Sequence, residues 1–312
     1  MNREDVMKDK SKEVTKSKGF AKARRREIIS GYLFVLPNFV GFFIFMMIPI
    51  VMGFVISFTN YDGFTKMDFV GFKNYIDMFK DDYFIVSVKN NFLYTLVTVP
   101  VTLVLSTLLA VALNTGIKGS SLFKTMYFFP YITSMVAVGI IWTLLFNPTV
   151  GPINNVLRAI GIANPPKWLL STKSALWAVM IVAIWKGVGY YMVMILAGLQ
   201  GIPKQLYEAA EVDGAGPVRK FFSITLPLLS PTTFMVTILS IISSFQVFDL
   251  IQIMTEGGPG RATNVLVYRI YQEGFQYMHY GYASAMAYFL FAVILVVTLI
   301  QFRGQKKWVT YM

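Results

Sequence analysis

The sequence predicts an all-α membrane protein with about six transmembrane helices, and three observations lead to this prediction. Hydrophobic residues make up 55% of the 312 residues and charged residues only 14%, whereas soluble domains have about 45–50% and about 25%. The mean hydropathy is correspondingly high, at +0.58. The apolar residues are gathered into long stretches, and each reaches the roughly 20 residues that a helix needs to cross the hydrocarbon core.

The expected spans cover residues 31–58, 90–113, 124–146, 175–198, 229–253 and 281–302. Within lipid, every backbone N–H and C=O must find a partner in its own segment, which favours helices over strands. The first stretch is longer than a bilayer requires and contains Pro37 and Pro49, so we expect a tilted or kinked helix there. Its basic flank is typical of a signal peptide, but the apolar run is too long for one, so we expect an uncleaved anchor.

Lysine and arginine residues predict how the spans are oriented. With the N-terminus inside, eighteen of the 28 basic residues lie in or beside inner segments and nine in or beside outer segments. The transmembrane domain at 31–302 is then flanked by a basic tail at 1–30 and a short tail at 303–312, both cytoplasmic. The polar residues 1–27 are expected to be disordered. The net charge of +12 would face anionic lipid head groups, so we expect no nucleic-acid partner.

The composition excludes several kinds of chemistry. The chain has no cysteine and a single histidine, His279, so it cannot form a disulfide or a thiolate or histidine-rich metal site. The spans contain no paired carboxylates and no nucleophile beside a base. We therefore predict no catalytic residues, no metal site and no enzymatic activity in this chain.

The expected inner loop between the fourth and fifth spans, residues 201–227, has its own pattern of helix signals. Pro203 suits the first turn of a helix, and good helix formers follow it. Gly214 can take the left-handed conformation that ends a helix. Pro217 can then begin a second short helix that ends near Pro227. The loop is therefore predicted to be a helix–turn–helix at the cytoplasmic membrane face, with a small apolar surface suited to docking a soluble partner.

This spacing resembles the EAA loop of the permeases of ATP-binding-cassette importers. The fixed positions of that loop correspond here to Glu208, Ala209, Ala210, Gly214, Ile224, Leu226 and Pro227. Other segments look like the carbohydrate-uptake branch, the MalF-like maltose permeases; they are Leu36-Pro37, Tyr127 to Pro130, Trp142, Gly187 to Gly201, Asp249 and Gly257 to Gly260. The sequence departs from MalF in its outer loop at 59–89, which is too short to hold the large inserted outer domain of that permease.

The resemblance implies a set of partners. It implies pairing with a second homologous permease, coupling of each EAA loop to one of two copies of a cytoplasmic ATPase, and delivery of solute by an extracellular binding protein. The chain has no GxxxxGK[ST] phosphate loop, so ATP and Mg²⁺ would be bound by the ATPase and no cofactor by this chain. The resemblance further implies a multi-pass protein in the plasma membrane of a prokaryote that imports a sugar, an oligosaccharide first, with a polyol phosphate as the alternative.

Lys186 lies within the fourth span, where an ionisable group is costly, and is therefore a candidate for the substrate path. The alternative is a packing lysine that pairs with a backbone carbonyl. Tyr190 and Tyr191 follow it, and aromatic faces with hydroxyl groups suit a sugar ring; with Lys186 in the path, an acidic sugar would also be favoured.

Gln246 and Asp249 lie one turn apart at the outer end of the fifth span, at a different expected depth from Lys186. They could bind sugar hydroxyls, or Asp249 could cap the turn that follows.

Three rival functions fit the sequence less well than an ATP-driven permease does. An ion-coupled secondary carrier usually has several acidic or histidine residues in its spans, and here only Lys186 and Asp249 qualify. A membrane enzyme lacks its reactive groups, as described above. A channel would need a charged ring or a filter loop, and the sequence contains neither.

Overall fold

The computed structural model describes residues 24–64, 67–114, 119–306 and 309. Within these ranges the chain is almost entirely helical, with one isolated β-bridge between Thr59 and Phe69. The chain divides into two compact units, residues 1–55 and 56–312, and each is described by itself.

The first unit is dominated by one long apolar helix, which runs as a single element from Arg24 to Ile56. A π-helical segment, η1 (Phe43–Met47), interrupts it and is followed by α2 (Ile48–Ile56). Pro49 has no N–H to donate and its ring would clash with the carbonyl one turn earlier, which accounts for an irregular turn at this point. The helix confirms the predicted first span. Residues 1–23 of the predicted tail lie outside the described residues.

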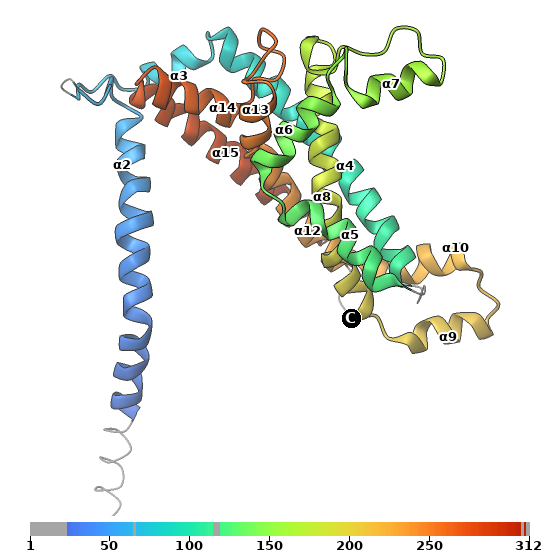
Figure 1. Ribbon diagram of the computed structural model, residues 1–312. Helices are drawn as coiled ribbons and strands as arrows, with labels where there is room; N and C mark the ends of the chain where they lie inside the picture. The colour runs from blue at the N-terminus through green and yellow to red at the C-terminus, as the bar shows by residue number, and fades with distance from the viewer. Residues whose placement is uncertain (1–23, 65–66, 115–118, 307–308, 310–312) are drawn as a thin grey trace, which may run out of the picture. The chain divides into compact units, whose positions relative to one another are not determined.

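The second unit holds the remaining helices (Figure 1). Its long helices are α4 (Asp82–Asn114), α8 (Ala175–Gln200), α12 (Ser230–Phe245) and α15 (Tyr280–Gln305), with α5 (Ser120–Ile132) and α6 (Met135–Leu145) beside them. Shorter elements at one end are α3 (Lys73–Met78), α7 (Pro152–Ala159), η2 (Trp168–Leu170), α13 (Asp249–Met254), α14 (Leu266–Tyr271) and η4 (Gln272–Gln276). At the other end are α9 (Lys204–Val212), α10 (Pro217–Lys220), η3 (Phe221–Thr225) and α11 (Leu226–Leu228).

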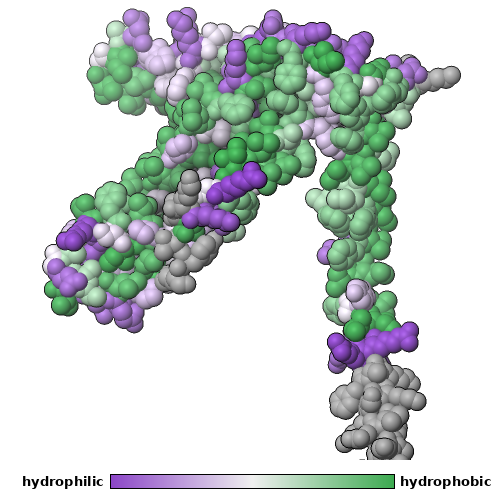
Figure 2. All heavy atoms as spheres, turned by 180° about the vertical axis from the view of Figure 1, so that it is seen from behind, coloured by the Kyte–Doolittle hydropathy of each residue, from purple (hydrophilic) through white to green (hydrophobic). Residues whose placement is uncertain are grey.

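Within the described residues, four helices are long and apolar enough to cross a membrane, or up to six if each of two bent pairs counts as one span. The prediction of an all-α membrane protein with about six spans is therefore confirmed. Figure 2 agrees with it, since most hydrophilic residues of the second unit lie at its two ends and the surface between them is largely hydrophobic.

The prediction of one continuous helix over 124–146 is wrong. The segment forms α5 and α6, whose axes differ by 96°. Pro130 lies in the last turn of α5, and Thr133 and Ser134 are extended, with ψ of 149° and 132°. The Thr133 hydroxyl donates to the Pro130 carbonyl at 2.6 Å, so one of the carbonyls left free at the helix end finds a partner.

The prediction of one helix over 229–253 is also wrong. Helix α12 ends at Phe245, and a second helix, α13, begins at Asp249. The apolar pattern continues through Val247 and Phe248 because both pack against a buried cluster rather than because they are helical. On its other side, α12 is bent by 66° from the segment Pro217–Leu228.

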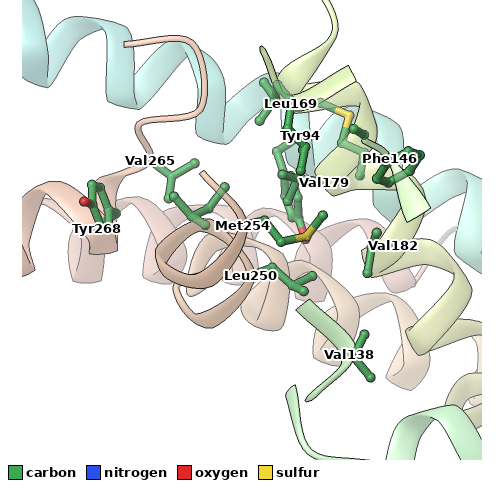
Figure 3. Close-up of a cluster of buried hydrophobic side chains, with 14 residues drawn as sticks. Tyr94, Val138, Phe146, Leu169, Val179, Val182, Leu250, Met254, Val265 and Tyr268 are labelled. Carbon is green, nitrogen blue, oxygen red and sulfur yellow. The ribbon is translucent and has the colours of Figure 1, made fainter. Parts of the chain in front are cut away.

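Helix α8 is the centre of the second unit, because α4, α5 and α12 all pack against it. Two glycines permit the close approach. A Cβ on Gly189 would lie 1.8 Å from the carbonyl oxygen of Tyr127 in α5, and one on Gly198 would lie 2.4 Å from Thr232 in α12. The buried cluster shown in Figure 3 joins α8 to α4, α6, α13 and α14. A second cluster joins α8 to α4, α12 and the start of α9.

Candidate functional site

The segment 201–227 forms a helical hairpin at the end of the unit where α8 ends and α12 begins (Figure 1). Helix α9 starts directly after Pro203 and ends before Gly214, which has a φ of +72°. The N–H of Gly214 donates to the Glu211 carbonyl at 3.0 Å, and that of Ala215 to the Ala210 carbonyl at 2.8 Å. These bonds close the helix end around a left-handed residue, as the sequence predicts. Pro217 begins the second arm, and that arm continues to Leu228, one residue beyond the predicted end.

The hairpin exposes several apolar side chains. Within the described part of the chain, Leu206, Val212, Val218 and Phe222 are exposed by 41%, 89%, 69% and 62%. Glu208 and Ala209 lie exposed on the same arm as Leu206. Exposed apolar side chains on an otherwise polar hairpin are available for a protein–protein contact.

The other residues predicted for coupling lie along the two arms. Leu226 is exposed, whereas Ala210, Ile224 and Pro227 are half-buried. Ala210 and Ile224 face a hollow of about 170 Å³ between the arms. The hollow is also lined by Asp213, Ala215, Arg219, Lys220 and Ser223.

The long helices enclose a second feature, a cavity of about 220 Å³. Four of the residues predicted for the substrate path line it together, namely Lys186, Tyr191, Gln246 and Asp249. Tyr190 is not part of the lining. Its ring stacks on that of Tyr131, which is, with a centroid distance of 4.3 Å. The other lining residues are Tyr94, Thr98, Val99, Thr102, Tyr131, Met135, Ala183, Gly187, Ser240, Ser243, Ser244, Val247, Phe248 and Leu250.

Lys186 is 6% exposed and directs its ammonium group at the break between α5 and α6. Nζ donates to the carbonyl oxygens of Pro130, Tyr131 and Thr133 at 2.8, 3.2 and 2.7 Å. A lysine has three N–H donors, so all of them are used. The structure thus has the carbonyl pairing that the sequence left as an alternative.

Asp249 is the first residue of α13 and is exposed at the cavity. We expected it at a different depth from Lys186, but both line the same cavity, because the chain turns between α12 and α13 instead of continuing outward as a helix. Asp249 does not cap the turn that follows. Within the described residues, the Thr263 hydroxyl donates to the Gly258 carbonyl at 2.8 Å and closes that turn.

Sequence reasoning missed part of the lining. Tyr94, Thr98 and Thr102 repeat every fourth residue along α4 and place their side chains on one face of an otherwise apolar helix. That polar row was a readable signal. No sequence pattern indicated that Phe248 and Ser243 would line the cavity, because their positions depend on where α12 ends. The finished cavity combines aromatic rings with hydroxyl, amide and carboxylate groups, a set suited to a polyhydroxylated ring.

Comparisons with known proteins agree with this geometry. The model of a family described as the binding-protein-dependent transport system inner membrane component matches residues 91–308. The probable ABC transporter permease protein YesP of Bacillus subtilis is 38% identical over 291 residues, which are 92% of this chain and 94% of that protein. The sn-glycerol-3-phosphate transport system permease protein UgpA of Yersinia pestis is 34% identical over 284 residues, which cover 90% and 95%.

A solved structure has the same fold. It is the crystal structure of a bacterial alginate ABC transporter in complex with an alginate pentasaccharide-bound periplasmic protein. One of its chains superposes with a TM-score of 0.81 at 25% identity, over 92% of this chain and 96% of that one.

Proposed function

The chain belongs to the family of binding-protein-dependent transport system inner membrane components, and from that membership we propose that it forms half of the path through which an ATP-driven importer moves a carbohydrate across the plasma membrane. The energy comes from ATP hydrolysed by a separate subunit, because this chain has no phosphate-binding loop. A permease of this family is a transport component and is not itself an enzyme.

The observation that carries the proposal is the exposed hairpin at 201–227. Its first arm continues from α8 and its second arm leads into α12, and both of these helices line the cavity. A partner that moved the hairpin would therefore act on two walls of the cavity at once. The exposed apolar side chains of the hairpin are the surface for that partner, a cytoplasmic ATPase that binds ATP and Mg²⁺. Glu208, Ala209, Ala210, Gly214, Ile224, Leu226 and Pro227 are the coupling residues in this proposal.

The orientation follows from the same assignment. If the hairpin contacts a cytoplasmic ATPase, the end of α15 is cytoplasmic as well, since both lie at one end of the unit (Figure 1). The excess of lysine and arginine in the inner segments supports this arrangement, and the basic tail at the N-terminus is then cytoplasmic too.

The remaining partners are a second homologous permease, a second copy of the ATPase and an extracellular solute-binding protein. The alginate transporter of the same fold is in complex with a periplasmic protein that carries the pentasaccharide. The cavity of about 220 Å³ is smaller than the roughly 300–1,000 Å³ of typical ligand pockets. A second subunit that completes the path would account for this difference.

A carbohydrate suits the cavity better than a polyol phosphate does, although UgpA transports the latter. A phosphate would need donors from cationic groups, and the three N–H groups of Lys186 are bonded to the main chain. The exposed polar residues of the lining are Tyr131, Ser243, Gln246 and Asp249. These groups exchange hydrogen bonds with neutral hydroxyls. An ion-coupled carrier is disfavoured because, in the described lining, Asp249 is the single carboxylate.

Uptake by proteoliposomes tests the substrate class. The chain is reconstituted with the permease, ATPase and binding protein encoded beside it, and is given labelled neutral oligosaccharides, acidic oligosaccharides and glycerol phosphate in turn. We expect ATP-dependent uptake of an oligosaccharide. Uptake of glycerol phosphate alone would contradict the carbohydrate assignment and support the alternative.

A further inference from the structure

The two arms of the coupling hairpin are joined by side chains at two levels. Near the base, the hydroxyl groups of Tyr207 on α9 and Thr225 at the end of η3 share a hydrogen bond of 3.0 Å. Near the tip, Nζ of Lys220 donates to Oε1 of Glu211 at 2.7 Å. We propose that the Tyr207–Thr225 bond is a clasp that makes the hairpin move as one body, so that these two residues position α12 for coupling. This inference rests on the proposed function of the hairpin.

The clasp differs from the pair near the tip in its surroundings. Thr225 is 6% exposed, and Tyr207 packs against the buried cluster that joins α8, α4 and α12. In the pair near the tip, the Glu211 side chain is 65% exposed and that of Lys220 is 19% exposed. An ion pair with one side chain in solvent contributes little to the free energy of unfolding. A hydroxyl as buried as that of Thr225 is costly to leave poorly bonded, and without Tyr207 it would depend on its longer, 3.4 Å contact to the Lys220 carbonyl. The base of the hairpin is therefore where the two arms are held together.

Thr225 also lies at the junction between the hairpin and α12. It is the last residue of the π-helical segment η3, and its hydroxyl is 3.4 Å from the Lys220 carbonyl. Its own carbonyl accepts the N–H of Leu229 at 2.9 Å, and the chain bends by 66° at Leu229. Leu229 is fully buried. A displacement of α9 that reaches Thr225 is thus passed through Leu229 to α12, which carries Ser240, Ser243 and Ser244 to the cavity.

Without the clasp, the connection between the two arms would rest on the turn at the tip, the ion pair of Lys220 and Glu211, and the packing of the Tyr207 ring. The turn contains Gly214 and Gly216, which restrict the backbone least. A push on α9 could then be absorbed in the turn while α12 stayed in place. The clasp prevents this independent movement of the two arms with a single hydrogen bond.

The test removes one hydroxyl at a time from the complete importer. Tyr207→Phe and Thr225→Val are compared with wild type for sugar transported per ATP hydrolysed, co-purification of the ATPase and thermal stability. Tyr277→Phe and Thr237→Val remove the same groups elsewhere; Tyr277 is exposed and follows η4, and Thr237 bonds within α12. Thr225→Ser keeps the hydroxyl.

We expect each clasp variant to lower transport per ATP by about fivefold, the size of one net hydrogen bond, with ATPase association intact. The double variant should be no worse than either single variant, because both remove the same bond. Thr225→Ser and the two control variants should match wild type. An unchanged transport ratio in both single variants would overturn the clasp, and so would a loss of ATPase association, which would assign the bond to docking. If the wild-type complex itself takes up no sugar with ATP, the proposed function fails and the clasp falls with it.

Discussion

Nζ of Lys186 donates a 2.7 Å hydrogen bond to the main-chain carbonyl of Thr133, 53 residues earlier in the chain. The bond joins the middle of α8 to the break between α5 and α6. Two further bonds from the same nitrogen reach Pro130 and Tyr131. The charge that the sequence offered as a substrate ligand therefore holds a bent helix pair in the shape that forms one wall of the cavity.

The first prediction concerns Lys186→Met, which should impair transport of neutral and acidic oligosaccharides equally. Three carbonyls lose the lysine as a donor, and of these the Pro130 carbonyl keeps the Thr133 hydroxyl. We expect a loss of about 2 kcal/mol in the free energy of unfolding. Uptake of both sugar types and thermal unfolding of the purified complex measure this. Lys173→Met, at an exposed lysine before α8, is the control and should behave as wild type. A selective loss of acidic sugars would show that Lys186 reads substrate charge.

The second prediction concerns Gly189→Ala, which should disrupt packing between α8 and α5. The new Cβ would lie 1.8 Å from the Tyr127 carbonyl oxygen, a backbone atom that cannot rotate away. Overpacking usually costs about 1–3 kcal/mol, and we expect the upper end here. Gly187→Ala is the matched control on the same helix, since its nearest neighbour would be 3.6 Å away. Equal thermal stability of the two variants would be evidence against the close contact.

The third prediction concerns Gly214→Trp, which should leave membrane insertion intact but abolish co-purification of the ATPase. Gly214 has a φ of +72° and open space around it, so the variant strains the turn and places a large ring on the docking surface. Gly161→Trp is the control, because Gly161 has a φ of +96° and equally open surroundings in the segment after α7. Normal co-purification with the Gly214 variant would rule out docking at the tip of the hairpin.

The fourth prediction concerns a buried ionic cluster at the opposite end of the unit. Arg269 bonds Asp81 at 3.2 Å and also pairs with Glu273. Arg269→Met removes the cation between two carboxylates, although Asp81 keeps the Tyr282 hydroxyl and Glu273 keeps His279. Breaking a buried ion pair costs about 3–5 kcal/mol, and we expect the lower end here. Arg261→Met is the comparison, because its pairing with Asp82 is exposed and spans 3.7 Å; its cost should be about 1 kcal/mol or less.

Thermal unfolding of the two variants in one detergent measures the difference. Similar losses of stability for Arg269→Met and Arg261→Met would mean that the Arg269 cluster contributes no more than a surface pair.

The sequence predicted most of the fold because lipid imposes one strong requirement. A run of about 20 apolar residues must be a helix, and the spans at 175–198 and 281–302 agree with α8 and α15 to within a few residues. The hairpin was also readable, since proline and glycine mark its ends by restricting or freeing φ.

The breaks were not predicted, because apolar residues fill them. Val247 and Phe248 continue the pattern of the fifth span while belonging to a turn, and their burial against α13 and α14 depends on long-range contacts. The surroundings of Lys186 were not predicted for the same reason, because they depend on a helix break that the apolar pattern does not show. Its partners are main-chain carbonyls that become free at the break near Thr133. No pattern of side chains indicates where a free carbonyl will lie.

Uptake measured with all ion gradients collapsed decides whether ATP hydrolysis drives transport through this chain. Proteoliposomes contain this chain, its partner permease, the ATPase and the binding protein, with ionophores present to remove proton and sodium gradients. We expect sugar accumulation that requires ATP on the hairpin side and that Gly214→Trp abolishes. Uptake that proceeds on an ion gradient without ATP, and that the Gly214 variant retains, would contradict it.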